Sequence, residues 1–180
     1  MEWKVLETKE LFSSGIFQLK VDRCELPDGR VMPKYYVMDF PDWVNVVPMT
    51  KEGEFILIKQ YRHASKEMHI EVPGGTLDPH RHESVEEGAL RELLEETGYK
   101  PQKMIKVGEH YPNPAIQSNR MHTYLALDCE KVKEQDLDPY EDLSLYFCSK
   151  EKMLEHLKKG EINHTIMVAS LFYALNHLDK

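Results

Sequence analysis

The segment from Gly74 to Tyr99 restricts the fold of this chain more than any other part of its sequence. It opens with two glycines, passes through a polar loop, and ends in the run Arg91-Glu92-Leu93-Leu94-Glu95-Glu96-Thr97-Gly98. Residues three and four positions apart in a helix lie side by side, so the three glutamates of this run share one face. The pattern predicts a glycine turn that leads into a helix with negative charge concentrated near its C-terminus.

This grouping of carboxylates is unfavourable unless a cation binds to it. Like charges at these spacings repel by roughly 0.2–0.5 kcal/mol per pair, and the helix dipole disfavours negative charge near a C-terminus. A hard ion such as Mg2+ would reverse the sign, because it takes carboxylate, water and phosphate oxygens as ligands. Arg91 precedes Glu95 by one helical turn and is expected to orient that carboxylate. An ordinary solvated helix face is the alternative, but it does not explain the glycines and the arginine occurring in the same segment.

Length, charge and cysteine content restrict the class of protein. A chain of 180 residues is expected to form one domain, with at most a short appendage. With a net charge of -8, the chain lacks the basic surface needed to bind nucleic acid or an anionic membrane. No apolar run approaches the roughly 18 residues of a membrane span, and the N-terminus lacks a signal-peptide profile. We therefore expect a cytoplasmic protein whose three separated cysteines are reduced and buried.

Residue patterns outside this segment predict mostly strands, followed by helices near the C-terminus. Alternating and β-branched residues indicate strands at residues 5–8, 16–26, 31–40, 43–47, 55–61, 69–72, 121–129 and 143–148. Helical periodicity covers residues 150–158 and 162–178, with Gly160 between them. These elements predict an α/β (α+β) sandwich with a mixed sheet in residues 42–180, and a small antiparallel sheet in residues 1–41.

The central segment resembles the Nudix box of the Nudix hydrolases. The resemblance rests on Glu83, seven intervening residues, and then the run from Arg91 to Tyr99. It implies a Nudix-type α/β/α sandwich that binds Mg2+, or Mn2+ in its place, through Glu92 and Glu96, with Glu95 and the carbonyl oxygen of Gly74 as further ligands. Seven residues separate Gly75 from Glu83, two more than the usual pattern of the family. A loop tolerates such an insertion at small cost, and Glu83 is expected to support the junction of loop and helix.

Motifs outside the box are similar to those of ADP-ribose pyrophosphatases and related nucleoside-diphosphate-sugar hydrolases. They are Gln60-Tyr61-Arg62, the stretch Glu71-Val72-Pro73-Gly74-Gly75, and Pro114, sixteen residues beyond Gly98. The resemblance implies a nucleotide-sugar substrate and a homodimer in which residues 1–41 also shape the nucleoside pocket. Without the resemblance, these residues would be read only as an edge sheet.

Four residues are candidates for contacts with the substrate. The planar guanidinium of Arg62 is suited to bind a phosphate through two hydrogen bonds, although an arginine at a strand end often forms a surface ion pair. Glu71 is expected to accept hydrogen bonds from a sugar or base, with a solvent-facing strand residue as the alternative. Pro114 is expected at the substrate because of its place in the subgroup pattern, and Arg120 is the best second phosphate ligand.

The mechanism implied by the resemblance is hydrolysis of a pyrophosphate bond by activated water, which requires a general base. Glu141, in the acidic loop 136–142, is the expected base, and Arg91 assists by orienting the carboxylates. The loop alignment also allows Glu141 to be a metal ligand, in which case Glu95 is the base. A GDP-mannose-type sugar, a dinucleotide polyphosphate and a non-catalytic nucleotide-binding module are the competing functions. The intact set of Arg91 and the three glutamates argues against the last of these.

Overall fold

The computed structural model describes residues 2–180 and divides the chain into two compact units. The smaller unit comprises the chain up to Asp42 together with Tyr111–Arg120. The larger unit comprises Trp43–His110 and Met121–Lys180. A loop from the middle of the sequence therefore groups with the N-terminal strands, an association that the strand pattern does not reveal.

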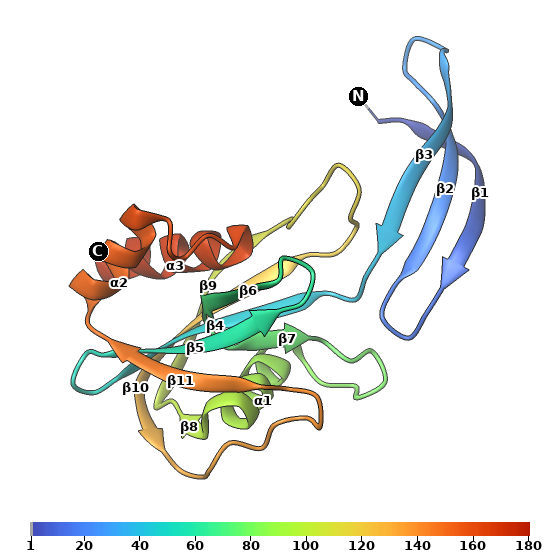
Figure 1. Ribbon diagram of the computed structural model, residues 1–180. Helices are drawn as coiled ribbons and strands as arrows, with labels where there is room; N and C mark the ends of the chain where they lie inside the picture. Colours follow the sequence, from blue (N-terminus) through green and yellow to red (C-terminus); the bar gives the residue numbers. More distant parts are fainter. Residues whose placement is uncertain (1) are drawn as a thin grey trace. The chain divides into compact units, whose positions relative to one another are not determined.

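The smaller unit is built on a three-stranded antiparallel sheet. Its strands are β1 (Lys4–Ser13), β2 (Gln18–Glu25) and β3 (Val31–Asp39), in the order β1-β2-β3 (Figure 1). A tight turn joins β2 and β3, in which Gly29 has a φ of 84° and the backbone N–H of Arg30 donates to Asp28 Oδ1 at 3.1 Å. The loop Tyr111–Arg120 joins this unit through a hydrogen bond from the Tyr35 hydroxyl to the Ala115 carbonyl at 2.7 Å.

The larger unit contains an eight-stranded mixed sheet. The strands are β4 (Trp43–Thr50), β5 (Phe55–Arg62), β6 (Glu67–Glu71), β7 (Gly74–Thr76), β8 (Tyr99–Lys100), β9 (Lys103–His110), β10 (Met121–Lys131) and β11 (Leu143–Cys148). The main path runs β11-β5-β4-β10-β8, with β6, β7 and β9 paired to β5, β4 and β10. The sheet is mixed because β4 and β10 run parallel, whereas the other pairs are antiparallel.

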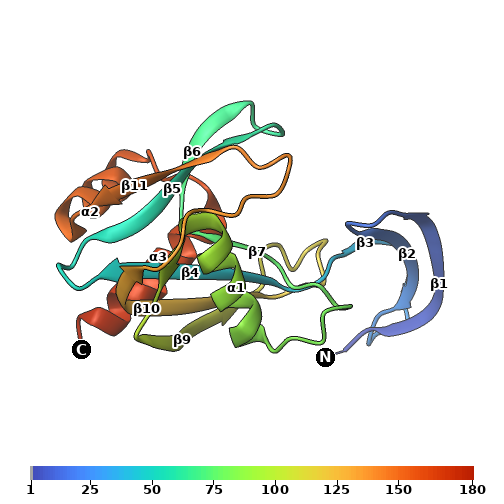
Figure 2. The ribbon, with the colours of Figure 1, turned by 90° about the horizontal axis from the view of Figure 1, so that it is seen from below.

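Helices lie on both faces of this sheet (Figure 2). Alternate residues of the central strands point to opposite sides. On one side, Val44 and Val46 belong to the apolar cluster that includes Leu93 of α1 (Val85–Thr97). On the other, Val47 joins Leu171 in a cluster built on α2 (Lys150–Lys159) and α3 (Thr165–Leu178). The predicted α/β/α sandwich with a mixed sheet is confirmed.

Local signals set the ends of α1. The Ser84 hydroxyl accepts from the Glu87 backbone N–H at 3.2 Å, and the Glu87 carboxylate accepts from the Ser84 N–H at 2.8 Å, which forms a capping box. At the other end Gly98 has a φ of 75°, and its N–H donates to the Leu94 carbonyl at 3.0 Å. Local hydrogen bonds therefore define both ends of α1, the helix that carries the glutamates.

The sequence patterns missed three strands and began the last helix too early. Strands β7 and β8 are too short to show alternation, and β9 contains a bulge opposite Thr123 and Tyr124 that breaks the two-residue period. The helix expected from residue 162 begins at Thr165, because His164 is its N-cap. The apolar residue that extended the prediction, Ile162, is buried but lies before the helix.

The three cysteines, Cys24, Cys129 and Cys148, are buried and unpaired, as predicted. Burial raises the pKa of Cys129 to about 12 and that of Cys148 to about 11, so both remain protonated thiols. Within residues 2–180, no helix has the length and apolar character required to cross a bilayer. A cytoplasmic location stays a prediction.

Candidate active site

A polar cleft of about 490 Å³ lies in the larger unit. Strand β5, the glycine turn, α1 and the acidic loop before β11 all contribute to its wall. The lining residues are Gln60, Arg62, Gly74, Gly75, Thr76, Asp78, Arg81, Arg91, Glu92, Glu95, Glu96, Asp136, Leu137, Asp138 and Glu141. The structure thus brings together the predicted metal ligands, the predicted base and one of the predicted phosphate ligands.

The glutamate face of α1 packs directly against the glycine turn. Glu92 is 9% exposed and Glu96 is 4% exposed, which is unusual for carboxylates. A Cβ atom on Gly75 would lie 2.5 Å from the Glu92 Cδ atom, so only glycine allows this approach. The backbone N–H of Gly74 donates to Glu96 Oε2 at 2.8 Å. A Cβ atom on Gly74 would clash with the Val44 carbonyl oxygen, so the turn that packs against these carboxylates requires glycine at both positions.

Arg91 fixes the positions of three carboxylates. Its guanidinium donates to both oxygens of Glu83, at 2.8 and 3.1 Å, and so fastens the loop to the helix. It also donates to Glu92 Oε1 at 2.8 Å and to Glu95 Oε2 at 3.0 Å. These hydrogen bonds and charges raise the pKa of Arg91. The expected contact with Glu95 is present, and Arg91 acts on Glu83 and Glu92 as well.

The carboxylate cluster is not fully neutralised by the protein. Burial, with the nearby charges of Glu92 and Glu141, raises the pKa of Glu96 to about 8. Burial also raises the pKa of Glu92, although Arg91 opposes the shift. Buried carboxyl groups whose charged forms are destabilised in this way fit a hard divalent cation, which would stabilise those forms. Within the described part of the chain, no three acidic, histidine or cysteine side chains already converge as a metal cage. Mg2+ holds few protein carboxylates and takes its remaining ligands from water and phosphate, which suits this donor set.

The acidic loop is attached to the end of α1. The N–H of Asp136 donates to the Glu95 carbonyl at 2.8 Å, and Gln135 Nε2 donates to the Glu96 carbonyl at 2.6 Å. Within the loop, the Asp138 N–H donates to Glu141 Oε2 at 2.9 Å. Both candidate bases, Glu95 and Glu141, line the cleft, and Arg91 engages only Glu95 directly.

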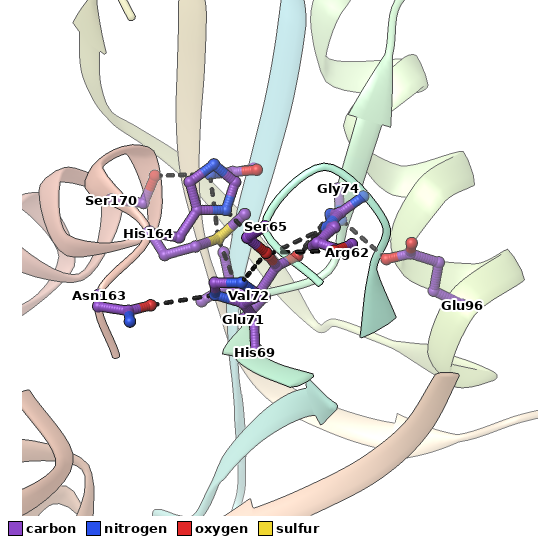
Figure 3. A network of polar contacts seen from close by, with 12 residues as sticks. Arg62, Ser65, His69, Glu71, Val72, Gly74, Glu96, Asn163, His164 and Ser170 are labelled. Carbon is purple, nitrogen blue, oxygen red and sulfur yellow. Dashed lines mark hydrogen bonds and ion pairs between the residues drawn. The ribbon is translucent and has the colours of Figure 1, made fainter. Parts of the chain in front are cut away.

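A second polar network holds Arg62 at the cleft (Figure 3). The Glu71 side chain is 0% exposed and accepts from Arg62 Nη2 at 2.5 Å and from Arg62 Nε at 3.1 Å. His164 Nδ1 lies 2.8 Å from the other oxygen of Glu71. Burial would raise the pKa of Glu71, but hydrogen bonds from His164 and Arg62 outweigh it and lower this pKa to about 2.

This network corrects the expectations for Glu71. The solvent-facing alternative is wrong, because Glu71 is buried. Direct contact with a sugar or base would require exposed carboxylate atoms, and the side chain has none. Glu71 instead orients Arg62, whose Nη1 group takes no part in the hydrogen bonds to Glu71. The alternative for Arg62 was a surface ion pair. Arg62 does form an ion pair, with Glu71, but this pair is half-buried and Arg62 still lines the cleft.

Other cleft residues had no predicted role in the site. Gln60 precedes Arg62 by two positions on β5 and so lies on the same face of the strand, a signal that strand periodicity could have supplied. Asp78 and Arg81 come from the extended loop after the glycines, whose conformation local patterns do not define. Pro114 and Arg120 belong to the smaller unit, where the Arg120 guanidinium lies 5.3 Å from the Tyr111 ring centroid. Their contacts with substrate stay predictions.

Comparison with known protein families agrees with this architecture. Residues 40–171 match the model of the NUDIX domain, and residues 3–38 match that of the nucleoside diphosphate sugar hydrolase N-terminal domain. The chain belongs to the Nudix family of hydrolases.

Similar proteins extend over nearly the whole chain. An ADP-ribose pyrophosphatase of Bacillus subtilis (strain 168) is 31% identical over 179 residues, which cover 99% of this chain and 93% of that one. A methanol dehydrogenase activator of Bacillus methanolicus is 30% identical over 173 residues, 96% of this chain and 92% of the relative. The crystal structure of an ADP compounds hydrolase superposes with a TM-score of 0.87 at 24% identity, covering 99% and 95% of the two chains. This structural likeness shows a shared fold.

The buried carboxylate of Glu71 gives a pH-dependent stability prediction. Its pKa is about 2 in the folded protein against an ordinary value of 4.5, so its contribution is present above pH 4.5 and is lost as the pH falls towards 2. At about 1.4 kcal/mol per unit, Glu71→Gln should lower the free energy of unfolding by about 3 kcal/mol at neutral pH, and by less at pH 3. Denaturant unfolding of both proteins at the two pH values measures this difference.

Glu155→Gln is the matched control. The pKa of Glu155 is also lowered to about 2, by hydrogen bonds from Lys159 and Lys152, but the residue is exposed on α2. Exposed ion pairs contribute little, so this variant should unfold like the parent protein. If Glu71→Gln lowered the free energy of unfolding equally at pH 3 and pH 7, the stabilisation would not come from the charge of Glu71.

Proposed function

We propose that this protein hydrolyses the diphosphate bond of ADP-ribose or a closely related nucleoside-diphosphate sugar. The products are a nucleoside monophosphate and a sugar phosphate. The observation that carries the proposal is the cleft in which the buried carboxylates of Glu92 and Glu96 and the guanidinium of Arg62 line one cavity. Similarity over 99% of the chain to an ADP-ribose pyrophosphatase supports the choice of substrate.

Mg2+, or Mn2+ in its place, is the proposed cofactor. Glu92 and Glu96 would hold it, with Glu95 and the Gly74 carbonyl oxygen as further ligands. Their oxygen donors fit such an ion, and their raised pKa values mean that a bound cation would stabilise the charged forms. When bound, the ion lowers the pKa of a coordinated water and offsets charge on phosphate oxygens.

The chain's own residues supply binding and proton transfer. Arg62 donates to a phosphate oxygen through the Nη1 group that Glu71 leaves available. Arg91 keeps Glu92 and Glu95 in place during the reaction. Glu141 takes the proton of the attacking water as the new P–O bond forms, and the phosphate leaving group departs without needing an acid. Glu95 is the alternative base, because it lines the same cleft.

The proposal is tested by incubating the protein with Mg2+ and a panel of nucleotide sugars and dinucleotide polyphosphates, with products identified by mass spectrometry. ADP-ribose should be cleaved to AMP and ribose 5-phosphate. Glu92→Gln should reduce kcat by orders of magnitude with an intact fold, because it removes charge at the reacting centre. Glu141→Gln should lose more kcat than Glu95→Gln if Glu141 is the base, and the reverse ranking identifies Glu95.

The competing functions give different outcomes in the same assay. Faster cleavage of GDP-mannose or of a dinucleotide polyphosphate would replace ADP-ribose as the substrate. No turnover of any compound, with binding retained, would indicate a nucleotide-binding module and overturn the enzymatic proposal.

We also infer that the smaller unit mediates a homodimer. Every residue of β1 is exposed, and its sheet, together with Trp3 just before it, presents several large apolar side chains to solvent. They are Trp3, Val5, Leu6, Leu11, Phe12, Val31, Met32 and Tyr36. Exposed apolar surface of this kind is typical of a contact with another chain. Light scattering should give twice the mass of one chain, and a monomer at micromolar concentration would contradict the inference.

A further inference from the structure

The loop between β7 and α1 is longer than the Nudix pattern and is firmly placed beside the cleft. At its start, Gly75 and Thr76 pair with β4, and at its end Glu83 is held by both hydrogen bonds from Arg91. Between them Asp78 forms a turn, accepting from the His80 N–H at 2.8 Å through its side chain and from the Arg81 N–H at 3.1 Å through its carbonyl. The loop is therefore ordered by contacts at both ends and in the middle.

This turn brings Arg81 to the cleft wall and leaves its neighbours outside. Asp78 and Arg81 line the cavity, whereas His80 and His82 do not. The Arg81 side chain is 52% exposed. It therefore remains accessible to a ligand while its backbone is fixed.

The three arginines of the cleft differ in how far neighbouring carboxylates compensate their positive charge. Arg91 directs four hydrogen bonds to Glu83, Glu92 and Glu95. Arg62 is committed to the buried Glu71 through Nε and Nη2. Within residues 2–180, Arg81 forms an ion pair with Asp78, in which Arg81 Nε lies 3.6 Å from Asp78 Oδ2, a distance longer than a hydrogen bond. Arg81 thus carries the least compensated positive charge in the cavity.

We propose that Arg81 binds the diphosphate of the nucleotide substrate and so contributes to specificity for it. The planar guanidinium can donate two parallel hydrogen bonds to phosphate oxygens, a pairing that lysine cannot reproduce. Seven acidic side chains line the same cavity, so a polyanionic ligand gains from each uncompensated cation at its wall. This role rests on the proposed function. It gives the long loop between β7 and α1 a contact with phosphate that the glutamates of α1 cannot make.

The variants Arg81→Ala and Arg81→Lys test the proposal through ligand affinity. Charge-assisted hydrogen bonds are stronger than neutral ones, and the partial exposure of Arg81 weakens them, so Arg81→Ala should raise KM for the diphosphate substrate by about tenfold with kcat nearly unchanged. The dissociation constant for ADP with Mg2+, measured by calorimetry, should rise by a similar factor. Arg81→Lys should restore part of the loss, and added salt should narrow the difference between the variants.

His80→Ala is the matched control, because it alters an exposed side chain of the same turn that does not line the cleft. This variant should keep the parent affinity for ADP, and all three variants should keep the affinity for uncharged adenosine. An ADP affinity in Arg81→Ala equal to that in His80→Ala would overturn the proposal. An equal loss for ADP and adenosine would overturn it too, since the loop would then act through its shape.

The binding measurement separates this inference from the proposed reaction. If the parent protein cleaves no ADP-ribose but Arg81→Ala still weakens ADP binding, the reaction is wrong and the assignment of Arg81 stands. If ADP-ribose is cleaved and Arg81→Ala changes neither KM nor ADP affinity, the reaction stands and the assignment of Arg81 is wrong.

Discussion

The structure depends on the packing of two glutamates of α1 against a turn made of glycines. Gly75 has no space for a Cβ atom because the Glu92 carboxylate occupies it, and the Gly74 N–H binds Glu96. Burying carboxylates in this way costs free energy, which the raised pKa values of both residues express. Arg91 offsets part of that cost, and a divalent cation bound in the cleft would offset more of it.

The parts of the site that are close in sequence could be predicted. Helical spacing alone placed Glu92, Glu95 and Glu96 on one face and put Arg91 next to Glu95. Strand alternation and helical periodicity predicted most of the elements of the sandwich. These features follow from local geometry, which the order of residues defines directly.

Features made by distant segments could not be read from the pattern. Glu71 was expected to meet solvent or substrate, but His164, from the start of α3, and Arg62 enclose it. The loop Tyr111–Arg120 groups with the N-terminal strands, and this association cannot be predicted from the periodicity of the sequence. Burial of a polar residue depends on which partner reaches it, and a single sequence does not record that information.

The most direct test of the central claim is the number of protons released when Mg2+ binds. Since the pKa of Glu96 is raised to about 8, its carboxyl is mostly protonated at neutral pH, and an ion that binds it must displace the proton. Calorimetric titrations at pH 7 in buffers of different ionisation enthalpy give this number. The account predicts a release of about one proton in the parent protein and close to none in Glu96→Gln. Equal values in the two proteins, or no uptake of Mg2+ by the parent with or without ADP, would contradict it.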